Sequence, residues 1–143
     1  TVLQRVLDLV NDARTNGHRC GRRNLPPVAP LTASEPLGRA AQRHAEDMAR
    51  QGYFDHRAPD GSTPGDRVRR AGYHPRLTGE NIAFGPESAE EVVRGWLESS
   101  GHCENIMDAR FAQIGIGLAE GSRRGHIYWV QSFGSAADHL PGG

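Results

Sequence analysis

Residues 114–134 read IGIGLAEGSRRGHIYWVQSFG and predict two strands joined by a turn. Large apolar residues alternate with small residues in the first part, and alternation resumes in HIYWVQSFG (126–134), with the period of two that is typical of strands. The intervening EGSRRG (120–125) is polar and contains glycine, as hairpin turns do. We therefore predict an antiparallel hairpin in the last third of the chain.

Helices are predicted ahead of this hairpin. Apolar spacing and capping residues, among them Ser34 and the Ser88–Glu91 pair, predict helices over 2–15, 35–51, 64–72 and 89–99. GENIAFG (79–85) predicts a short strand, HRCGRRNLPPVAPL (18–31) a connecting loop, and AADHLPGG (136–143) a frayed tail. Helices first and a hairpin last indicate an α+β domain, with helices packed on a small sheet.

Composition limits the classes of function. A chain of 143 residues fits one domain over 1–143, and we expect a monomer. The formal net charge is zero, which disfavours nucleic acid as a partner. No apolar run approaches the roughly 20 residues of a transmembrane segment. The first residues predict an amphipathic helix rather than a signal peptide, so we expect either an intracellular protein or one whose leader has been removed.

The two cysteines leave two alternatives open. Cys20 and Cys103 do not have the CxxC spacing of a metal site. They form either one disulfide, which would place the protein in an oxidising compartment, or two inert thiols.

Three polar stretches predict one assembled site. FDH (54–56), GENIAFG (79–85) and GWLESSGHCENIM (95–107) each place a titratable residue among glycines, aromatic residues and small residues. The candidate residues are His56, Glu80, Glu98 or Ser99, and His102. Histidine with a carboxylate is the basic set for binding a divalent metal or for acid–base chemistry near neutral pH.

The neighbours of these candidates sharpen their expected roles. Ser99, Ser100 and Gly101 are poor helix-interior residues, so a helix should break there. His102 then lies near a helix N-terminus, where the dipole keeps its ring neutral and able to bind metal. Glu80, in a predicted strand, must either face solvent or find a cationic, metal or hydrogen-bonding partner. His44 lies on the apolar stripe of the second helix and is expected to be a buried packing residue.

Motifs along nearly the whole chain resemble those of the CAP superfamily, especially its compact bacterial members. They are HAEDMARQGYFDHRAPDGSTPGDRVRRAGY (44–73), GENIAFG (79–85), GWLESSGHCENIMDARFAQIGIG (95–117) and YWVQSFG (128–134). The resemblance implies an α-β-α sandwich, with a small antiparallel sheet between helices.

The same resemblance implies a central cleft lined by two histidines and two acidic residues. Carried over, these positions are His56, Glu80 and His102, with Ser99 where many eukaryotic members have glutamate. Glu98 is one residue earlier, and one step on a helix turns a side chain by about 100°. His56, His102 and Glu80 could hold Zn²⁺ or another divalent cation with water at an open position.

The resemblance also implies export and a Cys20–Cys103 disulfide. Our first hypothesis is a secreted or periplasmic binding module, not an enzyme, whose cleft takes a divalent cation and a small-molecule or peptide ligand. The second is a metal-dependent, peptidase-like hydrolase in which Glu80 acts as base. The third is a non-catalytic module that binds a partner protein or lipid through its surface.

Overall fold

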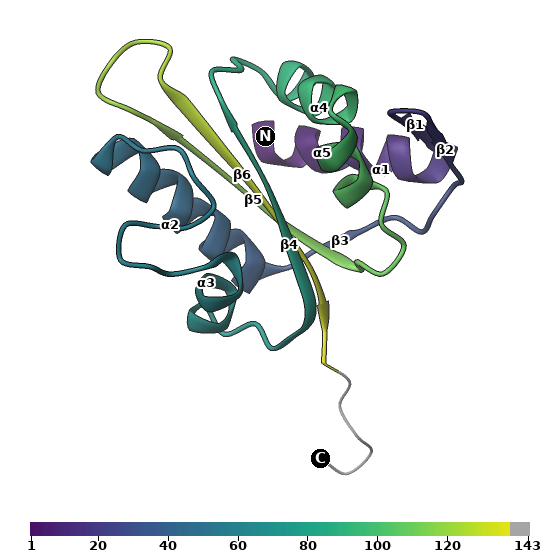
Figure 1. Cartoon of the computed structure of the whole chain (residues 1–143), viewed down its shortest axis with the longest axis horizontal. Helices are drawn as coiled ribbons and strands as arrows, with labels where there is room; N and C mark the ends of the chain where they lie inside the picture. Colours follow the sequence, from purple (N-terminus) through teal and green to yellow (C-terminus); the bar gives the residue numbers. More distant parts are fainter. Residues whose placement is uncertain (138–143) are drawn as a thin grey trace.

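The predicted hairpin forms the centre of the sheet. The computed structural model describes residues 1–137, in which β5 (Gln113–Glu120) and β6 (Ile127–Ala136) pair antiparallel, as predicted. On the other side of β6 lies β4 (Pro75–Phe84), and the two-residue β3 (Thr32–Ala33) lies parallel to β5. The strand order is β3-β5-β6-β4, so β4 is an edge strand (Figure 1). The predicted frayed tail began too early, since Ala136 ends β6 and the Ala137 N–H donates to the His74 carbonyl, and its remaining residues, 138–143, lie outside the described residues.

Helices cover both faces of this sheet. One face carries α2 (Glu35–Gln51) and α3 (Pro64–Arg70), and the other carries α1 (Val2–Asn16), α4 (Ala89–Glu98) and α5 (Ser100–Ile106) (Figure 1). Trp96, Trp129 and Phe133 fill the core beneath the second group, while Met48 and Val130 pack beneath α2. The α-β-α sandwich is therefore confirmed. None of the helices within 1–137 combines the length and apolarity of a membrane span.

The small residues of β5 allow α2 to approach the sheet closely. A Cβ atom at Gly117 would lie 2.5 Å from the carbonyl carbon of Ala41, and one at Gly115 would overlap the backbone of Leu37 and Gly38. The alternation that predicted the strand thus has a structural cause. Its large residues, such as Ile114, face the α1 side, and its glycines face α2.

The segment predicted as a plain connecting loop contains two short strands. β1 (His18–Cys20) and β2 (Arg23–Leu25) pair antiparallel around a two-residue turn in which Gly21 has φ +61°. Glycine at the first turn position favours such a tight hairpin. The loop prediction was incomplete because strands of three residues are too short to show a period.

β4 begins earlier than the strand predicted over 79–85. It starts at Pro75, and its pairing with β6 is irregular between Pro75 and Leu77. A proline fits at the first residue of an edge strand, where its missing N–H removes no ladder hydrogen bond. The added residues carry no apolar alternation, so the sequence did not indicate them.

A buried arginine joins α1 to the loop after α5. The Arg14 side chain is 1% exposed and donates hydrogen bonds to four backbone carbonyls, those of Ala29, Ile106, Asp108 and Phe111. These bonds compensate the guanidinium for its lost hydration. They also fix the position of α5, which carries His102.

Candidate functional site

Glu80 and His56 form the first half of the predicted site. Glu80 lies on the edge strand β4 with its side chain 3% exposed, and His56 lies in the loop between α2 and α3 with its side chain half exposed. His56 Nδ1 is 2.8 Å from Glu80 Oε1. The structure therefore brings together two residues that the sequence placed in separate motifs.

Arg67 is the partner of Glu80 that the sequence analysis missed. Its guanidinium, on α3, donates a 2.8 Å hydrogen bond to Glu80 Oε2 and a 2.7 Å hydrogen bond to the backbone carbonyl of His56. Of the partners expected for a buried Glu80, the structure contains a cationic one. The sequence indicated only that a buried Glu80 needs a partner. Nothing in DRVRR (66–70) distinguishes Arg67 from the neighbouring arginines.

His102 and Ser99 form the second half. Ser99 ends α4 and precedes α5, so the helix breaks at the predicted place. The Ser99 hydroxyl oxygen lies 2.8 Å from His102 Nδ1, within the first turn of α5. Glu98, the alternative candidate, is exposed and instead lines a cavity with His18 and Leu97.

The two imidazoles have opposite pKa shifts. The hydrogen bond from His56 to Glu80 raises the pKa of His56 above its ordinary value, against a smaller opposing effect of burial. Burial lowers the pKa of His102, and the charge of nearby His56 lowers it further. The lowered pKa of His102 favours the neutral ring that was predicted, but its main cause is burial rather than the helix dipole.

Side-chain amides connect the two halves of the site. Asn81 donates hydrogen bonds to the His102 carbonyl and to Gln131 Oε1, and Asn105 donates to Asn81 Oδ1 and to the Glu80 carbonyl. This network ties α5 to the outer edge of β4. Hydrogen bonds through Asn81 and Asn105 therefore connect the elements that carry His102 and Glu80.

Both rings make their hydrogen bonds through Nδ1. Nε2 of His56 and of His102 is then the nitrogen that can bind a further group. Both oxygens of Glu80 are already hydrogen-bonded, Oε2 to the Arg67 guanidinium and Oε1 to His56 Nδ1. Glu80 is thus placed to orient His56.

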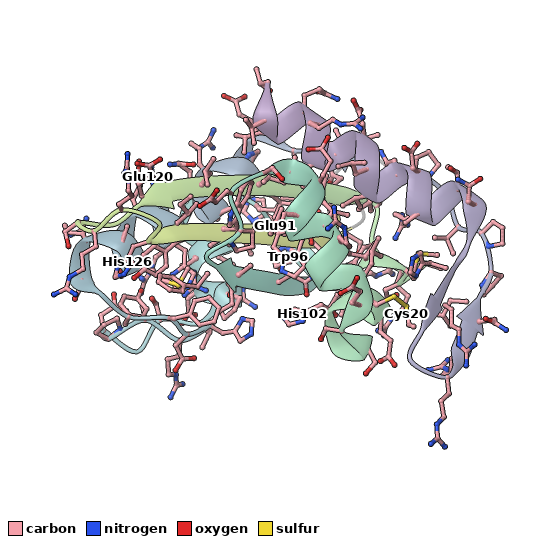
Figure 2. All side chains as sticks on the ribbon, turned by 90° about the horizontal axis from the view of Figure 1, so that it is seen from above. Cys20, Glu91, Trp96, His102, Glu120 and His126 are labelled. Carbon is pink, nitrogen blue, oxygen red and sulfur yellow. A yellow bond between two sulfur atoms is a disulfide. The ribbon has the colours of Figure 1, made fainter. Side chains whose placement is uncertain are left out.

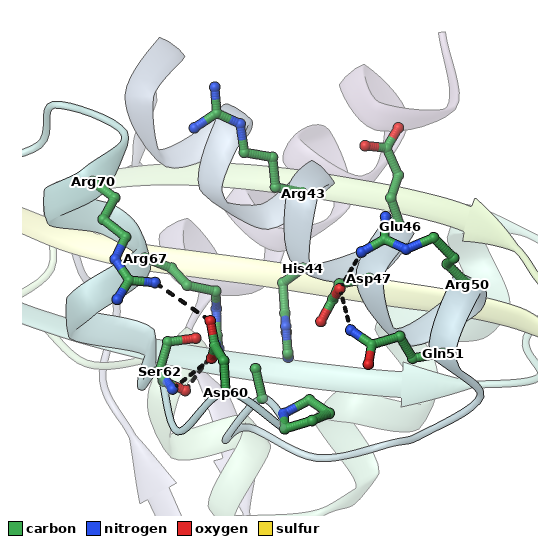
Figure 3. Close-up of a pocket in the computed structure, with 12 residues that line it drawn as sticks. Arg43, His44, Glu46, Asp47, Arg50, Gln51, Asp60, Ser62, Arg67 and Arg70 are labelled. Atoms are coloured by element: carbon green, nitrogen blue, oxygen red, sulfur yellow. Dashed lines mark hydrogen bonds and ion pairs between the residues drawn. The ribbon is translucent and has the colours of Figure 1, made fainter.

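A cavity of about 420 Å³ lies on the α2 side of Arg67 (Figure 3). Its lining includes His44, which is 1% exposed. His44 Nε2 lies 2.8 Å from the carbonyl oxygen of Asp55. Burial lowers the pKa of His44, as expected for the packing role predicted for it. Asp47 and Asp60 of this cavity pair with Arg50 and Arg70 (Figure 3).

The two cysteines form a disulfide beside α5. Cys20 on β1 is bonded to Cys103, as the resemblance implied (Figure 2). His18 lies beside this disulfide, and the ligand atoms of His18, Cys20 and Cys103 all lie within 4.8 Å of one another. Within residues 1–137, no other group of three or more histidine, cysteine and acidic residues is clustered this closely. In the oxidised protein its sulfurs are bonded to each other.

Comparison with known proteins places this architecture in one family. The Cysteine-rich secretory protein family model, CAP, matches residues 7–133. The uncharacterized protein YkwD of Bacillus subtilis (strain 168) is 39% identical over 106 residues, which are 74% of this chain and 40% of YkwD. This chain therefore spans about two fifths of that relative.

Solved structures agree. An extracellular protein containing a SCP domain from Bacillus anthracis str. Ames is 31% identical with a TM-score of 0.75, covering 92% of this chain and 39% of that one. An outer surface protein from Borrelia burgdorferi has the same fold, with a TM-score of 0.77 at 21% identity over 94% of this chain and 92% of that one. A family match from residue 7 to residue 133, together with this fold, shows that this chain belongs to the CAP family of cysteine-rich secretory proteins.

Proposed function

We propose that this protein is an exported CAP module that binds a divalent transition-metal cation through Nε2 of His56 and of His102. The observation that carries this proposal is that each ring has its Nδ1 engaged, by Glu80 in one case and Ser99 in the other. Metal-binding histidines typically make such a hydrogen bond through their second nitrogen, because it fixes the ring and its tautomer. Export is supported by the extracellular description of the Bacillus anthracis relative.

The donor set fits such an ion. Imidazole nitrogens suit zinc, copper and nickel, and two of them leave positions for water or for a ligand. The prediction that Glu80 is a third ligand stays a prediction, since direct binding requires its carboxylate to leave His56 or Arg67. In the present proposal Glu80 orients His56 and Ser99 orients His102.

Two exposed aromatic rings support the further proposal that the module also binds a small-molecule or peptide ligand. Phe54 and Phe84 are 49% and 45% exposed, and their ring centroids lie 6.2 Å apart. Phe54 is two residues from His56 in the same loop. A ligand held at the histidines could therefore gain apolar contact with these rings.

The same geometry favours binding over hydrolysis. A metal-dependent hydrolase would use Glu80 to take a proton from water. Both Glu80 oxygens are occupied by Arg67 and His56, and the side chain is 3% exposed. Water would have to displace one of these partners before Glu80 could act as a base.

Calorimetric zinc titration at pH 7.5 tests the proposal. We expect the wild-type protein in its disulfide form to bind zinc, and His56→Ala and His102→Ala to abolish that binding. Ser99→Ala should weaken it by about tenfold, the low end of the effect of removing an orienting partner. His74→Ala, at an exposed histidine elsewhere, is the matched control and should bind as the wild type does. Zinc binding that is unchanged in both site variants would refute the proposal.

A further inference from the structure

We propose a second metal site, for zinc, formed by Cys20, Cys103 and His18 when the disulfide is reduced. The ligand atoms of these three residues all lie within 4.8 Å of one another. His18 Nδ1 is 3.7 Å from Cys103 Sγ. The proposal does not depend on His56 or His102.

The spacing is close to what zinc requires. Bond lengths of about 2.3 Å to sulfur and 2.0 Å to nitrogen place the ligands of a tetrahedral zinc about 3.5 to 3.8 Å apart. The His18–Cys103 pair already has this separation, and the two sulfurs must move apart to reach it. Two thiolates and one imidazole with water in the fourth position are a ligand set that zinc accepts.

The redox step needs an external dithiol. The dithiol gives two electrons and two protons to the Cys20–Cys103 bond and is itself oxidised to a disulfide, which leaves two thiols on the protein. Zinc binding then releases both thiol protons. His18 Nδ1, now 2.9 Å from the Arg19 carbonyl, must give up that contact and bind the ion with its proton on Nε2.

Other contacts hold the ligands near one another once the bond is broken. Cys20 and His18 share β1, which remains paired to β2. Cys103 lies on α5, whose C-terminal carbonyl at Ile106 is held by Arg14 and whose Asn105 is bonded to β4. The three donors therefore need no long-range search to meet around an ion.

A cavity borders the His18 side of this group. His18 lines a space of about 380 Å³ between α1 and α4, together with Glu90 and Glu98. Arg94 lines the same space and Glu90 is paired with Arg5 at 2.9 Å, so the wall carries charges of both signs. Cys20 and Cys103 are buried, at 1% and 0% exposure, so reduction by the dithiol requires a transient local opening around the bond.

Cobalt substitution tests the site, because thiolate ligation gives a charge-transfer absorption that a site of histidines alone cannot give. Protein is reduced with an excess of dithiothreitol, freed of it anaerobically, and titrated with Co²⁺ and then with Zn²⁺. We expect the reduced wild type to show the thiolate band and to lose it when zinc displaces cobalt. The disulfide form should show no such band.

Variants separate this site from trivial thiol binding. His18→Ala should lower the cobalt affinity of the reduced protein by at least about tenfold, while His74→Ala should leave it unchanged. In a variant that also carries His56→Ala and His102→Ala, zinc should raise the unfolding temperature of the reduced protein and not that of its disulfide form. Absence of the thiolate band would overturn the proposal, as would equal affinity in His18→Ala and wild type. So would a reduced protein that remains unfolded with zinc present.

Discussion

At the scale of the residue, the Arg67–Glu80 pair is the costliest element of the site to disturb. Both side chains are largely buried, at 10% and 3% exposure, and they are joined at 2.8 Å. Replacing Arg67 with alanine leaves a buried carboxylate with His56 as its remaining side-chain partner, so we expect a loss of about 3 kcal/mol in the free energy of unfolding. Urea denaturation measures this loss.

Arg69→Ala is the matched control for that variant. Arg69 lies on the same helix and pairs with Asp66 at 3.8 Å, but its side chain is 62% exposed. A surface pair of this kind contributes about 0 to 1 kcal/mol. Equal losses in the two variants would show that Glu80 does not depend on Arg67.

The two site histidines should titrate in a fixed order. The folded pKa of His56 lies above its unfolded value of about 6.5, so protonated His56 stabilises the fold below that pH, and the contribution disappears as pH rises through the folded pKa. His102 has a lowered pKa, so its protonation opposes folding as pH falls from about 6.5 through the folded value. NMR titration should find His56 titrating above His102, and Glu80→Gln should lower the pKa of His56. The reverse order would contradict the assigned hydrogen bond.

The sequence identified the histidines but not the way they are held. His56, Glu80 and His102 stand in recognisable motifs, and local helix chemistry placed the break at Ser99. The contact between Arg67 and Glu80 joins residues 13 positions apart on two different elements. No local pattern indicates which of the many arginines meets a given carboxylate, because only the packed arrangement of α3 and β4 determines it.

At the scale of the element, glycines at two positions should respond in opposite directions to alanine. A Cβ at Gly117 meets the Ala41 backbone at 2.5 Å, so Gly117→Ala should force α2 from the sheet and cost about 3 kcal/mol or more. Gly95 is exposed within α4 and a Cβ there meets nothing within 4 Å, so Gly95→Ala should stabilise by about 0.5 to 1 kcal/mol. Thermal unfolding of both variants checks the pair. A tolerated alanine at Gly117 would mean that α2 does not press on β5.

Elements long enough to show a repeating pattern of apolar residues were predictable from the sequence, and the shortest strands were not. Helix α2 has the predicted bounds, because Ser34 caps it and its apolar stripe extends to Met48. Strands β1, β2 and β3 hold three residues or fewer, which is less than two periods of alternation. Their pairing depends on the Gly21 turn and on neighbouring elements, which the apolar pattern does not encode.

At the scale of the whole molecule, the site lies where the two layers of helices meet the edge of the sheet. Arg67 and His56 reach Glu80 from the α2–α3 side, while His102 comes from α5 on the other side. The β4 edge between them is not left open, since Trp96 and Asn105 donate hydrogen bonds to its outward carbonyls at Ile82 and Glu80. Any shift between the layers therefore changes the distance between the two histidines.

The disulfide is the covalent constraint on that arrangement. It joins residues 83 positions apart and fastens the N-terminal hairpin to α5, one residue after His102. The chain-entropy model gives an upper value of roughly 4 to 5 kcal/mol for a loop of this length. Cys20→Ser should thus lower the free energy of unfolding by several kcal/mol.

Loss of the disulfide could act on the unfolded chain alone or also on the position of α5, and zinc affinity distinguishes these two effects. If its role is only to restrict the unfolded chain, Cys20→Ser should unfold at lower urea concentration yet bind zinc at His56 and His102 with wild-type affinity below the transition. If it also positions α5, zinc affinity should fall while the protein is still fully folded. We expect the first result, because Arg14 and Asn105 hold α5 independently of Cys103. Calorimetric zinc titration of folded Cys20→Ser distinguishes these two roles of the disulfide. Arg14→Met is the comparison variant, because it loosens α5 while keeping the disulfide. A loss of zinc affinity in Cys20→Ser at full folding would assign the positioning of His102 to the disulfide.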